Sequence, residues 1–325
     1  MPQLFESYDD VDDIGERLKS DDAAERRVAI IELGNSGDPD AVAHLEAMVA
    51  DPDAGVRQQV ALALGEFDGV ATAAALARLL VDAEAPVATA AADSLAELKE
   101  AASAEPILPL VAHESAFVRM SALRALKELR RKDALKPALD ALRDVDALVR
   151  AQAIGVIGFL KLEESIPALT SATGDADGTV RRAAVSALAF SQLKPATDSI
   201  TRALADRDWM VREVAAETLG TNANGAQAAD ALIKAIGDEF WQVRLKAVRS
   251  LGKMRIARAV EAIGGCLTHP QANLRKEGAA ALGEIADPTG LKYLEAVFDD
   301  PDPEVRKNAR WGTQQILLKN ADMRQ

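Results

Sequence analysis

The residues best suited to catalysis or metal binding are few and lie in different parts of the sequence. The chain of 325 residues contains one cysteine, Cys266, and three histidines, His44, His113 and His269. A single cysteine excludes an internal disulfide framework and any multi-cysteine zinc or iron–sulfur site, and three separated histidines supply few ligands for a metal. Their spacing predicts no catalytic triad. Cys266 falls in an apolar helical pattern, so we interpret it as a small core residue rather than a nucleophile.

Phosphate and nucleic-acid chemistry lack their usual signals. Neither Gly-x-Gly-x-x-Gly nor a Gly-Lys-Ser/Thr loop occurs in the sequence. The formal net charge is −13, which argues against broad nucleic-acid binding because that depends on a basic surface. The charge is uneven: residues 1–105 carry 23 acidic and 7 basic side chains, whereas residues 106–325 carry 28 and 31. The acidic part either keeps an exposed end soluble or attracts a basic partner.

The sequence predicts neither a secretory signal nor a membrane span. Residues 1–10 lack a basic segment followed by an apolar run, which a secretory signal requires. No stretch of about 18 uncharged apolar residues occurs, so no membrane span is expected. We therefore predict a cytoplasmic protein.

An internal repeat predicts the elements that position these residues. A Val-Arg pair followed by an Ala-rich stretch and a Leu recurs every 31 residues, with one step of 32. The ten anchors, two of them weaker copies, are Glu25-Arg26, Val56-Arg57, Val87-Ala88, Val118-Arg119, Val149-Arg150, Val180-Arg181, Val211-Arg212, Val243-Arg244, Leu274-Arg275 and Val305-Arg306. A fixed period of this length is typical of stacked helical repeats.

Each repeat resolves into two helices, here called helix A and helix B. Apolar residues at the anchor and at four and eight positions after it form one buried stripe on helix B, as in Val56, Val60 and Leu64. Helix A precedes it, with apolar residues eleven and seven positions before the anchor, as in Leu45 and Val49. Glycines such as Gly34 and Gly252 follow the last buried residue of helix B, where they let two helices approach closely.

An aspartate stands five residues before the anchor in most repeats. These residues are Asp51, Asp82, Asp144, Asp175, Asp206, Asp238 and Asp300. Each can cap helix B or the turn that precedes it. Stacking would place this row of carboxylates beside the row of anchor arginines, in a geometry suited to bidentate pairing between neighbouring repeats. Because the arginines recur at one structural position, we assign them a packing role and no ligand site.

The aspartate, the Val-Arg pair, the Ala-rich helix and the closing Leu-Gly resemble HEAT-like repeats, in the short form found in phycobilisome lyase (PBS lyase) subunits. The resemblance covers residues 11–318. It implies an all-α fold, a right-handed α-solenoid of about ten HEAT-like helix pairs. We expect a single solenoid over residues 1–325, with an acidic N-terminal cap region at residues 1–20 and a C-terminal cap region at about residues 305–325.

One enzyme built on such repeats, deoxyhypusine hydroxylase, holds iron with His-Glu pairs at the start of helix B. The matching positions in this sequence contain no such pair; they read Gln58-Gln59, Ser121-Ala122, Gln152-Ala153 and Lys246-Ala247. The His-Glu dipeptide His113-Glu114 lies instead in a turn, at the place of the repeat aspartate, and we interpret it as a capping variant. We therefore expect neither a metal nor a resident cofactor.

Positions that differ between repeats are the candidates for binding, because shared positions are committed to stacking. Positions two, six and ten residues after the anchor lie on the side of helix B that lines the concave surface in this class. In the central repeats they read Met120, Arg124, Phe159 and Phe190, which predicts an apolar patch with a cation. The alternative is that Phe159 and Phe190 fold inward at helix ends.

A second candidate is a basic stripe in the eighth repeat. Lys246, Arg249 and Lys253 share one helix face, within a stretch of fifteen residues that holds six cations and no acid. This pattern indicates either a solvated helix face or an anion-binding surface.

We predict a non-catalytic protein-binding scaffold or assembly factor, whose unidentified protein partner contacts the central concave surface. Met120, Phe159 and Phe190 would form the centre, and Lys246, Arg249 and Lys253 a rim that attracts an acidic segment. The alternative, from the resemblance, is a bilin lyase or chromophore chaperone that binds a bilin transiently. Phe159, Phe190, Arg124 and Arg249 would then hold the planar ligand and its propionates.

Overall fold

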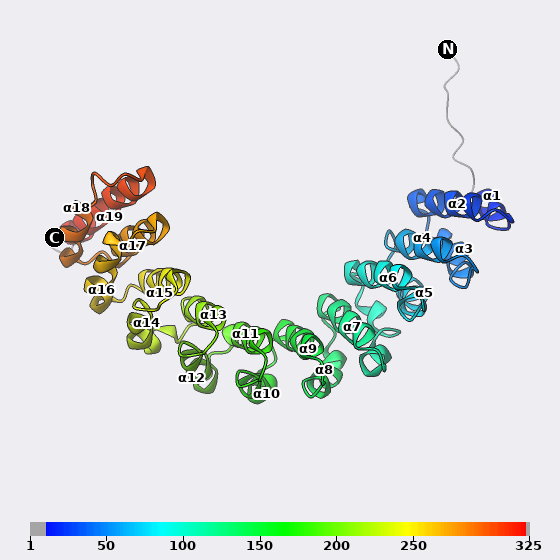
Figure 1. Ribbon diagram of the computed structural model, residues 1–325, viewed down its shortest axis with the longest axis horizontal. Helices are drawn as coiled ribbons and strands as arrows, with labels where there is room; N and C mark the ends of the chain where they lie inside the picture. The colour runs from blue at the N-terminus through cyan, green and yellow to red at the C-terminus, as the bar shows by residue number, and fades with distance from the viewer. Residues whose placement is uncertain (1–10, 323–325) are drawn as a thin grey trace, which may run out of the picture. The chain divides into compact units, whose positions relative to one another are not determined.

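Apolar stripes with a helical period become pairs of helices throughout the described part of the chain. A computed structural model describes residues 11–322, and every regular element within them is helical. All ten predicted pairs occur there. In Figure 1 their B helices are α2, α4, α6, α7, α9, α11, α13, α15, α17 and α19. The all-α solenoid architecture is thereby confirmed.

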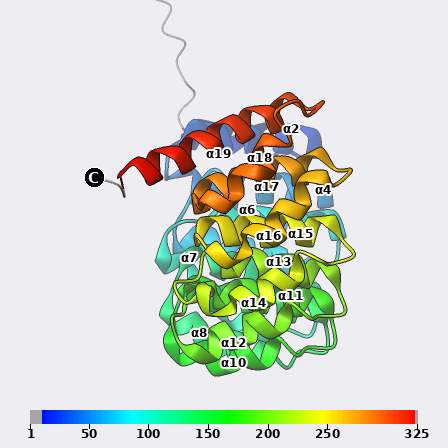
Figure 2. The ribbon, with the colours of Figure 1, turned by 90° about the vertical axis from the view of Figure 1, so that its left-hand side faces the viewer.

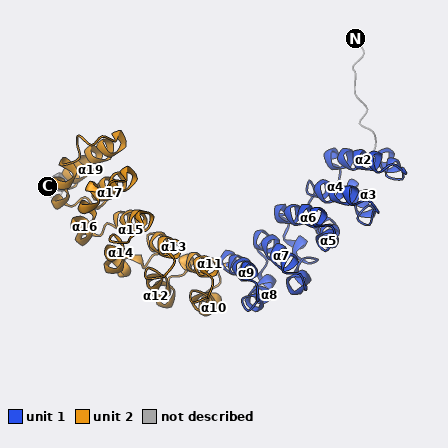
Figure 3. Ribbon diagram, in the orientation of Figure 1, with its two compact units in different colours: residues 1–160 blue, residues 161–325 orange. Residues whose placement is uncertain are grey.

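The chain divides into two compact units, residues 1–160 and 161–325 (Figure 3), and each is described by itself. The elements of the first unit are α1 (Val11–Arg17), α2 (Ala23–Ser36), α3 (Ala41–Ala47), α4 (Ala54–Leu64), α5 (Val70–Leu80), α6 (Ala85–Glu97), the 3₁₀-helices η1 (Ala101–Ala104) and η2 (Leu108–Ala112), α7 (Ala116–Leu129), η3 (Lys132–Ala134), α8 (Leu135–Ala141) and α9 (Ala147–Leu160). The single solenoid over residues 1–325 stays a prediction.

The second unit has the same pattern of paired helices. Its elements are η4 (Glu163–Ser165), α10 (Ile166–Ala172), α11 (Gly178–Ala187), η5 (Leu188–Phe190), α12 (Lys194–Ala203), α13 (Trp209–Leu219), η6 (Gly225–Ala228), α14 (Ala229–Ala235), α15 (Trp241–Lys253), η7 (Ala257–Ala259), α16 (Val260–Gly265), η8 (Cys266–Thr268), α17 (Ala272–Ile285), η9 (Pro288–Gly290), α18 (Leu291–Glu295) and α19 (Pro303–Asp322). The predicted C-terminal cap falls largely within α19. Of the predicted N-terminal cap, residues 1–10 lie outside the described residues and Val11–Arg17 form α1.

Within each unit the B helices form one layer and the A helices another. In the first unit α2 packs on α4, α4 on α6, α6 on α7, and α7 on α9. In the second unit the contacts run from α11 through α13, α15 and α17 to α19, and Figure 2 shows α17 and α19 side by side. Each helix therefore finds its packing partners in its own repeat and in the repeats next to it.

The core lies between the two layers and is built from small and medium-sized side chains. Val56, Val60 and Leu64, the predicted stripe of α4, are completely buried. Adjacent B helices approach closely where glycines face them. A Cβ atom on Gly252 would lie 2.8 Å from the Cα of Ala281, so a side chain there would push α15 and α17 apart.

One repeat departs from the others in the first unit. Its helix A consists of the two 3₁₀-helices η1 and η2 instead of an α-helix. Pro106 and Pro109 lie in this segment, and proline lacks the N–H that an α-helix interior requires. Ile107 and Val111 nevertheless remain buried at the predicted apolar positions. Residues 98–134, between α6 and α8, are called the irregular repeat below.

Candidate functional site

An arginine–aspartate ladder connects neighbouring repeats at the turns between helices A and B. Arg119 donates from Nε and Nη2 to the two carboxylate oxygens of Asp144, at 2.6 and 2.8 Å. Its Nη1 donates to the carbonyls of His113 and Glu114, at 2.9 and 2.8 Å. The same bidentate contact joins Arg26 to Asp51, Arg57 to Asp82, Arg181 to Asp206, Arg212 to Asp238 and Arg275 to Asp300. The predicted pairing between neighbouring repeats is confirmed.

The ladder aspartates cap the turn rather than helix B. Asp144 accepts a hydrogen bond from the N–H of Asp146, at 2.8 Å, and Asp146 in turn accepts from the N–H of Leu148, in the first turn of α9. Of the two capping roles that the sequence left open, the aspartate five residues before the anchor therefore takes the second. The hydrogen bond from Arg119 also holds the pKa of Asp144 below its usual value.

The ladder is interrupted once in each unit, where a histidine replaces the aspartate. In the first unit Ala88 stands at the arginine position and His113 at the aspartate position. In the second unit His269 takes the aspartate position opposite Arg244. The Nδ1 atoms of His113 and His269 accept from the N–H of the residue two positions later, each at 3.1 Å. Both histidines thus keep the turn-capping role, as predicted for His113.

The structure places Met120, Arg124 and Phe159 in the B-helix layer of the first unit. Met120 and Arg124 lie on α7, half-buried and exposed respectively, and the guanidinium of Arg124 is 3.0 Å from the carboxylate of Asp93. Phe159 lies on the adjacent α9 and is 40% exposed, so it does not fold inward. The guanidinium of Arg130 lies 4.8 Å from the centre of its ring. This part of the predicted surface therefore carries paired charges around an exposed aromatic ring.

The remaining predicted residues belong to the second unit. Phe190 ends η5 and is half-buried. On α15, the Nζ of Lys246 lies 2.7 Å from a carboxylate oxygen of Glu217, and Arg249 donates to both carboxylate oxygens of Glu277, at 2.9 and 2.7 Å. Lys253 is exposed.

Sequence reasoning missed the acidic partners of the basic stripe. Glu217 lies on α13 and Glu277 on α17, which are the B helices on either side of α15. They stand 29 and 28 residues from their partners, two and three residues short of the 31-residue period, so a search for carboxylates about one repeat away would have found them. An acid-free stretch of sequence therefore does not give an acid-free surface when repeats stack.

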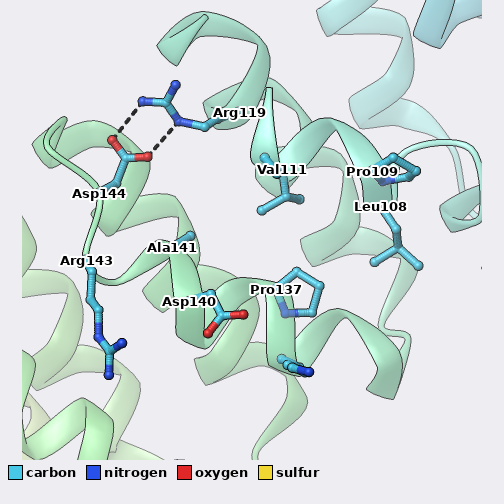
Figure 4. Close-up of a pocket in the computed structure, with 11 residues that line it drawn as sticks. Leu108, Pro109, Val111, Arg119, Pro137, Asp140, Ala141, Arg143 and Asp144 are labelled. Atoms are coloured by element: carbon cyan, nitrogen blue, oxygen red, sulfur yellow. Dashed lines mark hydrogen bonds and ion pairs between the residues drawn. The ribbon is translucent and has the colours of Figure 1, made fainter. Parts of the chain in front are cut away.

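Sequence reasoning also missed the two pockets that flank the irregular repeat. The first, about 490 Å³, lies between η2 and α8. Figure 4 shows Leu108, Val111 and Pro137 around it, with the Arg119–Asp144 pair at one side. The second, also about 490 Å³, lies at the interruption of the ladder, where Ala88 and His113 line it. The prolines and the missing Arg–Asp pair were the sequence signals.

Asp68, in the turn before α5, fixes the start of the irregular repeat. Its carboxylate accepts from the N–H groups of Lys99 and Glu100, at 2.6 and 3.0 Å, and from the hydroxyl of Ser103, at 3.0 Å. Burial opposes the charged form, but these hydrogen bonds outweigh it and lower the pKa of Asp68. The next residue, Gly69, has a φ of 108°, which disfavours any side chain there.

The residues first considered for catalysis do not converge. Burial raises the pKa of the Cys266 thiol to about 11, so it is protonated at neutral pH, in keeping with its predicted core role. Among the described residues, no three His, Cys, Asp or Glu side chains are grouped so that they could hold a metal ion. None of the helices in residues 11–322 is long and apolar enough to cross a membrane.

Comparison with known proteins identifies the repeat. The family described as HEAT repeats matches residues 11–96, 135–220 and 229–313. The match leaves out residues 97–134, which contain the irregular repeat. A search of curated protein sequences found no match.

Several solved structures share the fold at low sequence identity. An engineered protein is 20% identical, with a TM-score of 0.51, over 94% of this chain and 98% of its own. YibA of Escherichia coli is 18% identical, with a TM-score of 0.60, over 82% of this chain and 97% of its own. A chain from a structure of Kap95p binding to RanGDP is 15% identical, with a TM-score of 0.60, over 94% of this chain and 48% of its own. These likenesses show a shared fold, and the repeat match, which covers more than half of the chain, shows that the chain belongs to the HEAT-repeat family.

Proposed function

We propose that the chain is a non-catalytic protein-binding scaffold or assembly factor, and that its partner contacts the irregular repeat. The observation that carries this proposal is the concentration of unusual features at one repeat. The segment that the family pattern leaves out has a 3₁₀ helix A, an interrupted ladder and a pocket on each side. Because regular positions are used for stacking, departures of this kind are where a repeat protein has surface free for a partner.

Exposed apolar side chains near these pockets support the proposal. Phe117, in the first turn of α7, is 38% exposed and lines the pocket at the ladder interruption. Leu148, at the same position of the next repeat, is also exposed. Aromatic and aliphatic groups of this kind serve as anchors when a partner covers them. Met120 and Arg124 lie on α7 as well, so they belong to the proposed surface.

The other predicted contacts remain proposals with weaker support. Lys253 is the exposed member of the basic stripe, whereas Lys246 and Arg249 already pair with carboxylates. No observation favours the bilin-binding alternative, in which Arg124 and Arg249 would hold propionates, since both are paired within their own units. The particular likeness to phycobilisome lyase repeats and the cytoplasmic location also stay predictions.

Site-specific photocrosslinking tests the proposed function. A photoreactive phenylalanine analogue is placed at Phe117 or Met120 of the full chain, and at Arg78 on α5 as a control on an exposed A helix. We expect one adduct of defined mass from cell extract at the first two positions and none at the control. Adducts only at the control, or none at any position, would contradict the proposal. With the adduct identified, Phe117→Ala should weaken binding by about 1–2 kcal/mol.

A further inference from the structure

The pocket at the ladder interruption of the first unit has the features of a binding site for a guanidinium group. We propose that it receives an arginine side chain from the partner protein, in place of the arginine that this repeat lacks. The inference rests on the proposed function, because it names the chemistry by which the partner is held. Its basis is a comparison of this position with the same position in the other repeats of the chain.

The intact repeats define where a guanidinium is bound. In each of them Nη1 of the anchor arginine donates to the carbonyl six positions before it, and in all but Arg212 also to the carbonyl five positions before it. Arg57 donates in this way to Asp51 and Pro52, at 2.8 and 3.3 Å, and Arg181 to Asp175 and Ala176, at 3.0 and 3.1 Å. The site is therefore made partly of backbone, which every repeat possesses whatever its side chains are.

At Ala88 the corresponding carbonyls are those of Asp82 and Ala83. Within residues 11–322, neither carbonyl accepts a hydrogen bond from a side chain. Ala88 is buried, with 6% of its surface exposed, and its methyl group fills little of the space that an arginine side chain occupies in other repeats. A pocket of about 490 Å³ lies at this position, lined by Asp82, Ala83, Ala88 and His113. Its volume lies within the range of ordinary ligand pockets.

The histidine that replaces the ladder aspartate is compatible with a guanidinium. Nδ1 of His113 accepts a hydrogen bond from the N–H of Ser115, so this nitrogen is held by the turn. In the second unit an arginine of the chain itself lies at the same kind of position, opposite a histidine. There Arg244 lies opposite His269, and its Nε donates to the carbonyl of Asp238, six positions before it. The chain thus contains its own example of an arginine bound opposite a histidine.

Charge and shape favour arginine over other side chains. The first unit carries 29 acidic and 16 basic residues, whereas the second carries 22 of each, so the net negative charge lies in the first unit. Glu114 is among the residues that line the pocket, and the exposed ring of Phe117 offers a face on which a guanidinium can stack. A planar fork of donors can reach both carbonyls at once, which a lysine ammonium does less well.

A short peptide tests the pocket without knowledge of the partner. The probe is the peptide acetyl-Leu-Arg-Leu-amide. It is added to the full chain, and binding is followed by the NMR signals of the backbone amides of the protein. We expect saturable shifts at Ala88, Thr89, Ser115 and Phe117. The matching lysine peptide should bind about tenfold more weakly, and the neutral citrulline peptide should cause no such shifts.

Two variants fill the pocket from within the chain. Ala88→Arg restores the side chain that other repeats carry, and Ala88→Met fills the space without a donor. Both should abolish the shifts, whereas Ala223→Arg, at an exposed turn of the second unit, should leave them unchanged. Circular dichroism confirms that each variant is folded.

Equal shifts with the lysine peptide, or shifts that persist in folded Ala88→Arg, would overturn the proposal. Those results would leave the crosslinking test of a protein partner unaffected. If the peptide binds but no partner is crosslinked, the proposed function would be contradicted, whereas the proposal of an arginine-binding pocket would stand.

Discussion

Glu284 is a glutamate whose partial burial lowers the stability of the folded chain when its carboxylate is charged. It lies half-buried on α17, and a Cβ atom on Gly252 would lie 2.7 Å from its Oε2, so the glycine makes room for the carboxylate. Burial, followed by the nearby Glu277, raises its pKa, although Lys253, Arg255 and Arg249 oppose this shift. The folded state therefore binds the proton more tightly than the unfolded chain. The stability that this tighter proton binding supplies is complete below the unfolded pKa, and it is lost as the pH rises through the raised folded pKa.

Glu284→Gln should accordingly raise the melting temperature at neutral pH, because the neutral amide avoids the cost of a half-buried charge. The gain should shrink as the pH approaches about 4.3, where a glutamate is ordinarily half protonated. Thermal unfolding at the two pH values measures the difference. Glu261→Gln on α16, which alters an exposed glutamate, is the matched control and should change little at either pH. A gain of the same size at both pH values would show that desolvation of the charge is not the cause.

At the level of helices and turns, the ladder predicts a strong dependence on arginine itself. The side chains of Arg181 and Asp206 are 6% and 11% exposed, and Arg181 also bonds to two backbone carbonyls. Arg181→Ala leaves the buried carboxylate of Asp206 without its partner, so the free energy of unfolding should fall by about 3 kcal/mol or more. Arg181→Lys should recover only part of this loss, because an ammonium cannot reproduce the planar fork.

Denaturant unfolding measures these changes, with the exposed pair Lys194–Asp198 as the control. Lys194→Ala should cost no more than about 0.5 kcal/mol, because that pair joins solvated side chains within one helix. Adding Asp206→Ala to Arg181→Ala should cost less than the sum of the single changes, since each removes the same contact. Fully additive losses would mean that the pair does not act as a unit.

The same ladder predicts how the chain responds to acid. Hydrogen bonds from Arg57, Arg119 and Arg275 hold the pKa values of Asp82, Asp144 and Asp300 below their usual values. The stability that these pairs supply is complete above the unfolded pKa of about 3.9, and is lost as the pH falls through the lower folded values. Arg119→Gln should therefore move acid unfolding, followed by circular dichroism, to a higher pH. An unchanged acid midpoint would exclude Asp144 from the transition.

The period of the sequence predicted the helix pairs and the ladder, because both depend on positions that recur in every repeat. Val56, Val60 and Leu64 are buried as expected, and the Arg–Asp pairs form between neighbouring repeats. The period could not predict the 3₁₀ helix A of the irregular repeat, which depends on prolines found in that repeat. The partners of Lys246 and Arg249 were missed for another reason: they lie on helices one repeat away, and the basic stripe was assessed from its own helix alone.

At the level of the whole chain, the unequal charge of the two units separates their roles in binding. The acidic first unit contains the irregular repeat, both of its flanking pockets and the exposed ring of Phe117. In the second unit the acidic and basic residues are equal in number, and two cations of the basic stripe are paired with carboxylates. We therefore expect the first unit to provide most of the attraction for a basic partner, and that attraction to weaken with salt.

Both units should fold as separate chains. Each contains a continuous stack of B helices, from α2 to α9 and from α11 to α19, and repeats of this kind draw their stability from themselves and their neighbours. Residues 1–160 and residues 161–325, expressed separately, should each show the circular dichroism of a helical protein and a cooperative thermal transition.

A cut after Leu204 is the control, because a fragment of residues 205–325 keeps α13 but lacks its partner α12 and so exposes the buried face of α13. This fragment should melt at a lower temperature than residues 161–325. If residues 161–325 were unfolded under mild conditions while the full chain stayed helical, the second unit would depend on the first, and nearest-neighbour stability would not describe this chain.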